Sequence, residues 1–257
     1  MKPGKKILAV VVLSLWFPEI RLFAESIQIA VASNFAEPAN IISKDFEKEF
    51  KTKVLVSVGS SGRLYAQIKN GAPWSVFLCA DNVYTQKLID EKFADEKTRK
   101  IYALGKLALW SWKNNLKIDE TSVFDPSNKI LSIASSRLAP YGQASEEVLK
   151  KINFNKQKFH GKIVYGENIS QAMNYVKTKN ADIGFVSKSL INALPDDEKG
   201  SYWEVPASLH NPIKQEIVLL NNNSGSKLAE KYIDFLDKES SRKIISEFGY
   251  DLPARSK

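Results

Sequence analysis

Cysteine and histidine are scarce in this chain, which has one Cys and two His among its 257 residues. A disulfide framework needs pairs of cysteines, and a Cys-rich zinc or iron–sulfur site needs several, so the lone Cys79 rules these out. His160 and His210 lie far apart in the sequence, and neither belongs to an HExxH pattern. Most metal hydrolases and Ser–His–Asp enzymes are therefore disfavoured.

Glycine and proline, with 12 and 10 residues, are too few for a collagen-like or low-complexity chain. The sequence also lacks a basic stripe interleaved with aromatic residues, so we expect no binding to nucleic acid. The formal net charge is +8, but the first 24 residues contribute +3 of it and leave +5 for the rest. A modest positive field of this kind helps to attract a small anion.

The N-terminus has the anatomy of a secretory signal peptide. A basic segment, MKPGKK, is followed by an apolar run over residues 7–17, and Pro18 ends this run. The run is too short to span a bilayer comfortably, and Ala24 offers a small residue for cleavage. No Cys follows it, so a lipid anchor is not expected. We predict that residues 1–24 are a signal peptide and that the mature protein is exported and soluble; the alternative is a buried N-terminal helix.

Strand and helix patterns alternate along the rest of the chain. Hydrophobic residues at every second position predict a strand over Ser26–Ala32, and spacings of three and four predict a helix over residues 35–50. Further strands are predicted at 54–58, 76–80, 106–112, Ile130–Ala134, 162–165, 183–186 and Ile213–Leu220. Further helices are predicted up to Asn70 and at 83–93, 142–152, 169–179, 226–236 and 240–248. This alternation favours mainly parallel sheets with helices on both faces.

Small polar residues stand where several predicted strands give way to helices. These junctions are Ser33-Asn34, Ser60-Ser61-Gly62, Ser135-Ser136, Pro140-Tyr141-Gly142, Asn168-Ile169-Ser170 and Ser187. In an open α/β sheet such junctions gather at the carboxyl ends of the strands, where ligands bind. Helix N-termini there present unpaired N–H groups and partial positive charge, which favours an anion site built without Lys, Arg or metal. The alternative is that each residue is only an ordinary helix N-cap.

Six segments, in order, carry a family resemblance: IAVASNFAEPA, VGSSGRLYAQIKNGAP, FLCAD, APYGQASEEVL, ENISQAM and ADIGFVSKS. They resemble the successive motifs of the periplasmic molybdate-binding proteins of ABC importers, and residues 208–220 resemble the return strand of that family. The resemblance extends from about residue 26 to residue 248. It implies a two-lobed α/β solute-binding fold with two crossings between the lobes and an oxyanion in the cleft.

The resemblance also implies the organisation and partners of the protein. Residues 25–104 and 206–257 would form one lobe and residues 105–205 the other. The ligand would be molybdate or tungstate, in which the metal lies within the oxyanion, so neither a bare cation nor a cofactor is implied. The protein would be a periplasmic monomer that serves a membrane ABC permease and is not an enzyme. Two alternatives stay open: a binding protein for sulfate or phosphate and, less favoured, an enzyme on the same scaffold.

Five residues match ligand positions of the resembled family: Ser33, Asn34, Ser61, Tyr141 and Ile169. The resemblance implies that Ser33 and Ser61 donate through their hydroxyl and backbone N–H groups. Tyr141 and Ile169 would donate through their backbone N–H groups, and the residue at the place of Asn34 is a ligand in some members.

Three positions depart from the pattern of the resembled family. Ser187 stands where many members have a Tyr whose hydroxyl touches the oxyanion, and Ser has the shorter reach, so the fifth donor would be Ser187, a water molecule or another residue such as Asn34. Ser75 replaces an Asp, and Gln215-Glu216 replaces a Tyr-Pro pair. The last two departures are expected to bear on lobe packing rather than on the ligand.

Overall fold

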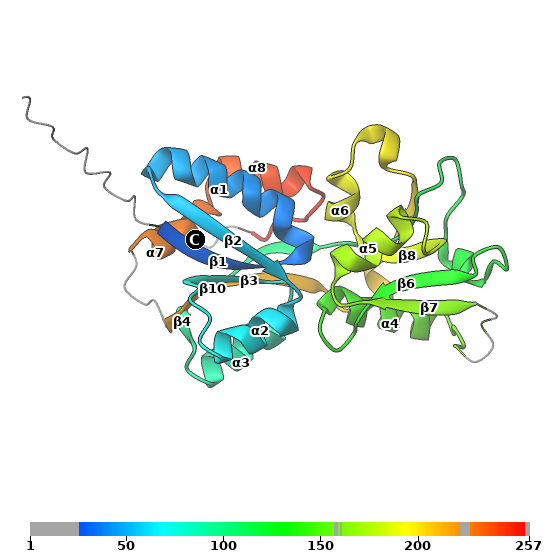
Figure 1. Ribbon diagram of the computed structural model, residues 1–257, viewed down its shortest axis with the longest axis horizontal. Helices are drawn as coiled ribbons and strands as arrows, with labels where there is room; N and C mark the ends of the chain where they lie inside the picture. The colour runs from blue at the N-terminus through cyan, green and yellow to red at the C-terminus, as the bar shows by residue number, and fades with distance from the viewer. Residues whose placement is uncertain (1–25, 157–158, 160, 222–226, 255–257) are drawn as a thin grey trace, which may run out of the picture.

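The computed structural model describes residues 26–156, 159, 161–221 and 227–254, which form two lobes side by side (Figure 1). The predicted signal peptide, residues 1–24 with its cleavage at Ala24, lies outside the described residues. Within the described part of the chain, no helix has both the length and the apolar character needed to cross a membrane.

The first lobe contains a five-stranded sheet with the order β2-β1-β3-β10-β4. Its strands are β1 (Ser26–Ala32), β2 (Lys53–Gly59), β3 (Val76–Cys79), β4 (Ala94–Gly105) and β10 (Ile213–Leu220). β2, β1 and β3 run parallel, whereas β10 is antiparallel to both of its neighbours. The alternating Ile27, Ile29 and Val31 of β1 are all buried in one core, as their spacing predicts.

Helices cover both faces of the first sheet (Figure 1). They are α1 (Ala36–Phe50), α7 (Lys227–Phe235) and α8 (Glu239–Glu247) on one face, and α2 (Ser61–Lys69) and α3 (Val83–Asp90) on the other. Phe46 of α1 packs edge-on against Tyr232 and Phe235 of α7, with ring centroids 5.2 and 5.3 Å apart. Burial of an aromatic side chain of this size stabilises the fold by about 1.5–3 kcal/mol. The amphipathic spacing of α1 places Phe46 on the face of the helix that packs on the core, and this burial holds the helix against the sheet.

The second lobe repeats this plan with the strand order β7-β6-β8-β5-β9. Its strands are β5 (Leu107–Ser111), β6 (Ile130–Ala134), β7 (Lys162–Gly166), β8 (Ile183–Ser187) and β9 (Ser201–Glu204). β7, β6 and β8 run parallel, and β5 is antiparallel to β8 and β9. One face packs on α4 (Pro140–Lys151), and the other packs on α5 (Ile169–Lys177) and α6 (Lys188–Asn192). Short 3-10 helices are η1 (Ser33–Phe35), η2 (Glu120–Phe124), η3 (Asp196–Glu198) and η4 (Ala207–Leu209).

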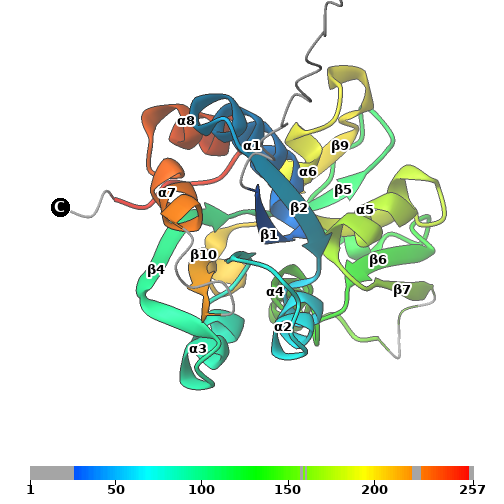
Figure 2. The same cartoon turned by 60° about the vertical axis from the view of Figure 1, so that its left-hand side comes forward.

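The chain crosses between the lobes twice. It leaves the first sheet at the end of β4, enters the second at β5, and returns between β9 and β10 (Figure 2). Lys106, between β4 and β5, has its Nζ 2.9 Å from Asp251 of the first lobe and 3.6 Å from Glu204 of the second. These ion pairs hold the crossing segment to both lobes.

The prediction of two α/β sheets flanked by helices is confirmed, and both sheets are mixed rather than purely parallel. The strands β4 and β9 were not predicted from the sequence. Both are edge strands with some exposed residues, and β4 carries the charged run DEKTRK. Charged side chains are common on edge strands because they discourage pairing with other chains, and they also hide the hydrophobic alternation that marks a strand.

Candidate functional site

A small cavity lies between the lobes where strand ends and helix starts face each other. None of the twelve residues that line it has a charged side chain. The first lobe contributes residues 32–34 after β1, 59–61 after β2 and Ala80 after β3. The second lobe contributes residues 139–141 at the start of α4, and Asn168 and Ile169 at the start of α5. The parallel order of β2-β1-β3 and β7-β6-β8 brings these junctions together.

All five residues predicted as ligands line this one cavity. Ser33, Asn34, Ser61, Tyr141 and Ile169 are each at most 3 % exposed. The structure therefore brings together residues that lie as much as 136 positions apart in the sequence. Their role as ligands stays a prediction.

Three helices begin at the cavity, and their first N–H groups have no partner within the helix. The N-cap residues of α2 and α4, Ser60 and Ala139, make no side-chain cap hydrogen bond. At α5, Asn168 Oδ1 accepts a hydrogen bond from Gln171 N at 3.0 Å, which caps the third N–H group. Since the positive ends of three helix dipoles also meet here, the cavity favours a negatively charged occupant.

The hydroxyl oxygen of Ser61 is held in position by a backbone contact. Its Oγ accepts a hydrogen bond from the backbone N–H of Ala80 at 3.1 Å. A serine hydroxyl can accept one bond and still donate another, so this contact fixes the position of Oγ without using its hydrogen.

Asn34 uses its side-chain amide away from the cavity. Nδ2 donates to Gln215 Oε1 at 2.7 Å and to Tyr250 Oη at 2.9 Å. Both amide hydrogens are thereby occupied, and the remaining donor of Asn34 is its backbone N–H. Ser187 does not line the cavity, and its Oγ pairs with Ser189 Oγ at 3.0 Å. Neither side chain considered for the fifth donor is therefore free to face the cavity.

A buried polar cluster behind the cavity was not predicted from the sequence. Tyr250 Oη donates to the backbone oxygen of Asn34 at 2.8 Å or to Ser189 Oγ at 3.0 Å, and Gln215 is fully buried beside them. Burial raises the pKa of Tyr250, so its hydroxyl stays neutral. The sequence offered one signal for this cluster, namely that Gln215-Glu216 replaces the Tyr-Pro pair of the resembled family. That replacement did not indicate which residues Gln215 contacts.

Hydrogen bonds join the lobes around the cavity. Ser170 Oγ donates to Ser33 O at 3.1 Å, and Ser189 Oγ donates to Asn34 O at 2.9 Å. Further bonds run from Gly62 N to Leu138 O and from Tyr84 Oη to Arg137 O, both at 2.9 Å. The structure therefore has its lobes closed over the cavity.

An ion pair also bridges the lobes next to the cavity. Arg63 Nη1 in the first turn of α2 lies 3.1 Å from both carboxylate oxygens of Glu167, which stands just before α5. The two side chains are 58 % and 36 % exposed. Arg63 therefore points across the mouth of the cleft rather than into the cavity.

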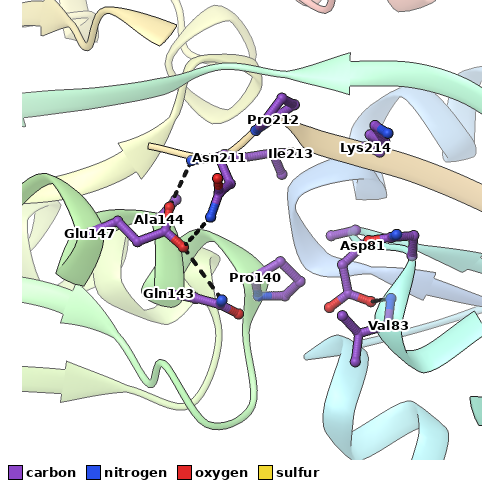
Figure 3. A pocket seen from close by; sticks show the side chains of 12 residues that line it. Asp81, Val83, Pro140, Gln143, Ala144, Glu147, Asn211, Pro212, Ile213 and Lys214 are labelled. Carbon is purple, nitrogen blue, oxygen red and sulfur yellow. Dashed lines mark hydrogen bonds between the residues drawn. The ribbon is translucent and has the colours of Figure 1, made fainter. Parts of the chain in front are cut away.

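A larger hollow adjoins the cavity at Ala80 and Pro140 (Figure 3). Its lining includes the carboxylates of Asp81 and Glu147 and a single cation, Lys214. Burial raises the pKa of Asp81 above its ordinary value. Two carboxylates disfavour an anion, so the larger hollow is the poorer candidate for the site predicted from the sequence.

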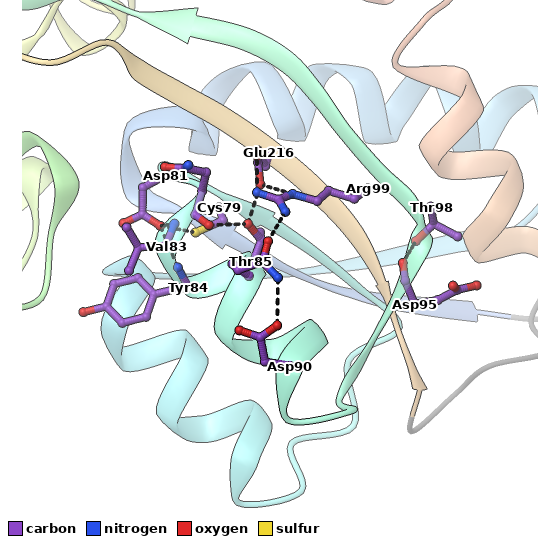
Figure 4. A network of polar contacts seen from close by, with 12 residues as sticks. Cys79, Asp81, Val83, Tyr84, Thr85, Asp90, Asp95, Thr98, Arg99 and Glu216 are labelled. Atoms are coloured by element: carbon purple, nitrogen blue, oxygen red, sulfur yellow. Dashed lines mark hydrogen bonds and ion pairs between the residues drawn. The ribbon is translucent and has the colours of Figure 1, made fainter.

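Glu216, the second residue of the changed Tyr-Pro pair, takes part in a network inside the first lobe (Figure 4). It pairs with Arg99, whose Nε lies 2.7 Å from a carboxylate oxygen, and it accepts a hydrogen bond from Thr85 Oγ1. The side chain of Glu216 is only 4 % exposed, so this pairing compensates for the burial of its charge. The network bears on packing within the lobe, as expected.

No catalytic centre is evident in the described part of the chain. Cys79 is fully buried in β3, where burial raises the pKa of its thiol, and His210 Nδ1 lies 2.7 Å from Asn211 O. Neither residue lines the cavity. Within the same described residues, His, Cys, Asp and Glu form no group of three or more that could hold a metal ion.

Comparison with known proteins agrees with the resemblance drawn from the motifs. Residues 27–251 match the model of a family described as bacterial extracellular solute-binding protein. The chain is 39 % identical to the molybdate-binding protein ModA of Azotobacter vinelandii, over 89 % of this chain and 91 % of the relative. It is 38 % identical to ModA of Rhodobacter capsulatus, over 86 % of each chain. The solved structure of the periplasmic molybdate-binding protein of Azotobacter vinelandii matches with a TM-score of 0.83 and 32 % identity, and the match covers 89 % of this chain and all of that one.

Proposed function

Because the chain belongs to the family of bacterial extracellular solute-binding proteins, we propose that it binds molybdate, or the similar anion tungstate, and delivers it to a membrane ABC permease. The observation that carries this proposal is the uncharged cavity, in which serine hydroxyls and three helix N-termini converge between closed lobes. The proposed donors are the five residues predicted from the sequence.

Neutral donors suit a dianion that must be released again. Burying a dianion is costly unless its oxygens are hydrogen-bonded, so capture requires that both lobes supply donors at once. Ser33 and Ser61 come from the first lobe, and Tyr141 and Ile169 come from the second. The closed form is then the state that carries the ligand, and it is the form that a permease would recognise.

The same cavity argues against phosphate as the ligand. Phosphate is often protonated at neutral pH, and a carboxylate is a suitable acceptor for its O–H group. None of the residues that line the cavity has a carboxylate, since Asp81 belongs to the neighbouring hollow. The lining holds serine hydroxyls but no His, Asp, Glu or Lys that could act as their general base, which also supports a carrier rather than an enzyme.

The argument against sulfate is one of size. Sulfate has the charge and shape of molybdate but shorter bonds to oxygen, so donors placed for molybdate cannot all reach it. Each buried donor left unmatched costs about 1–3 kcal/mol, and two of them give a preference of roughly 30-fold or more.

Isothermal titration of the anion-free mature protein with molybdate, tungstate, sulfate and phosphate tests the proposal. We expect tight binding of molybdate and tungstate, and an affinity for sulfate that is at least roughly 30-fold lower. Equal binding of sulfate would instead assign the protein as a general oxyanion carrier.

Export is the second part of the proposal, because a periplasmic carrier must leave the cytoplasm. Mass spectrometry of the protein from its native host should find an N-terminus within a few residues of Glu25. An intact Met1 on cytoplasmic protein would contradict the proposed location.

A further inference from the structure

Ser60 is the N-cap residue of α2, but its side chain does not cap the helix. Its φ of −72° and ψ of 148° are those of an N-cap, yet Oγ accepts no hydrogen bond from the first turn. The residue is 2 % exposed, and within the described part of the chain its Oγ has no hydrogen-bond partner. A serine at this position normally accepts from the second or third N–H group of the helix, so the free hydroxyl calls for an explanation.

Ser60 differs in this respect from its neighbours around the cavity. Ser61 Oγ is held by Ala80 N, and Asn168 caps α5. Tyr141 Oη also has no partner, but it extends toward the crossing segment, where a Cβ added to Gly105 would lie 2.2 Å from it. Gly105 does not line the cavity. The Ser60 hydroxyl is therefore a buried group at the cavity that forms no hydrogen bond with any described part of the protein.

A buried hydroxyl without a partner destabilises a fold, and it is retained where something else satisfies it. Ser60 lies among the donors of the proposed anion site, next to the N-terminus of α2. We propose that the Ser60 hydroxyl donates a hydrogen bond to an oxygen of the bound oxyanion, in addition to the five predicted ligand residues. This inference rests on the proposed function, and it adds a side-chain donor where Ser187 and Asn34 supply none.

The test compares Ser60→Ala with Ser241→Ala. Ser241 is the matched control because it is 1 % exposed, its Oγ also lacks a partner, and it lies in α8 away from the cavity. Titration with molybdate should show binding weakened by about 10- to 150-fold in Ser60→Ala, and unchanged affinity in Ser241→Ala. The melting temperature of each anion-free variant should equal or exceed that of the parent, because neither change removes a hydrogen bond within the protein.

Parental affinity in Ser60→Ala would overturn the inference while leaving the proposed function intact. A marked fall in the anion-free melting temperature of Ser60→Ala would also overturn it, because the hydroxyl would then have a structural partner. Failure of the parent protein itself to bind molybdate would instead refute the proposed function.

Discussion

Replacing Ser61 with alanine separates the binding role of its hydroxyl from its structural role. Ser61 is 1 % exposed at the start of α2, and its Oγ accepts the backbone N–H of Ala80 at 3.1 Å. Ser61→Ala removes this acceptor together with the hydroxyl hydrogen proposed to reach the anion. Two independent losses are therefore expected, one in the anion-free protein and one in the complex.

The structural loss follows from Ala80, which is itself 1 % exposed. Without Ser61 Oγ, its N–H group stays buried and unpaired, at a cost of about 1–3 kcal/mol. In a domain of this size each kcal/mol lowers the melting temperature by roughly 2–4 °C. The anion-free Ser61→Ala variant should therefore melt several degrees below the parent.

The binding loss comes from a hydrogen bond to a charged group, worth roughly 1.5–3 kcal/mol or about 10- to 150-fold in affinity for molybdate. Ser33→Ala is the matched comparison, because Ser33 is the other first-lobe serine predicted to donate its hydroxyl to the anion, and it lines the same cavity. It should lose affinity to a similar extent.

Calorimetric titration and thermal melting of both variants check these expectations. Parental affinity in Ser61→Ala would mean that the residue only positions the helix. An unchanged melting temperature in that variant would refute the structural account of the Ala80 contact.

Three further predictions concern the closed cleft. Glu167→Gln removes the ion pair with Arg63 across the cleft, and a partly exposed pair of this kind is worth about 0.2–1 kcal/mol. Release of molybdate, measured by stopped flow, should therefore accelerate by roughly 1.5- to 5-fold. The control Glu198→Gln breaks an ion pair within the second lobe and should leave the release rate unchanged. Gly105→Ala places a Cβ 2.2 Å from Tyr141 Oη, so the melting curve of this variant should show destabilisation by about 1–3 kcal/mol. The added change Tyr141→Phe removes the clashing oxygen and should restore part of the lost stability. If the second change restores no stability, the clash is refuted. Molybdate affinity should not change from about pH 6 to 9, because the ionisable side chain in the cavity lining is Tyr141, and burial raises its pKa well above the usual value. A change of affinity within this pH range would show that an ionising group contacts the anion.

The sequence predicted those parts of the fold that a single local pattern specifies. The alternation of Ile27, Ile29 and Val31 marks β1 because one face of that strand is buried. In β4 the charged run DEKTRK hides this alternation, and β9 has only 4 residues, so both were missed. β2 is also an edge strand, but it keeps valines at alternate positions and was predicted. The junction residues could be grouped because the carboxyl ends of parallel strands meet at one edge, a property of the topology that does not depend on side-chain detail.

Contacts between residues far apart in the chain were beyond sequence reasoning. Asn34 was a candidate donor, but its amide is held by Gln215 and Tyr250, which lie 181 and 216 positions away. Nothing in the local sequence of Asn34 specifies these partners, because they come from β10 and from the segment after α8. The same cluster binds the backbone oxygen of Asn34 through Ser189 of the second lobe. Because this contact joins Asn34 of the first lobe to Ser189 of the second, it links the Asn34 peptide at the cavity to the closed arrangement of the lobes.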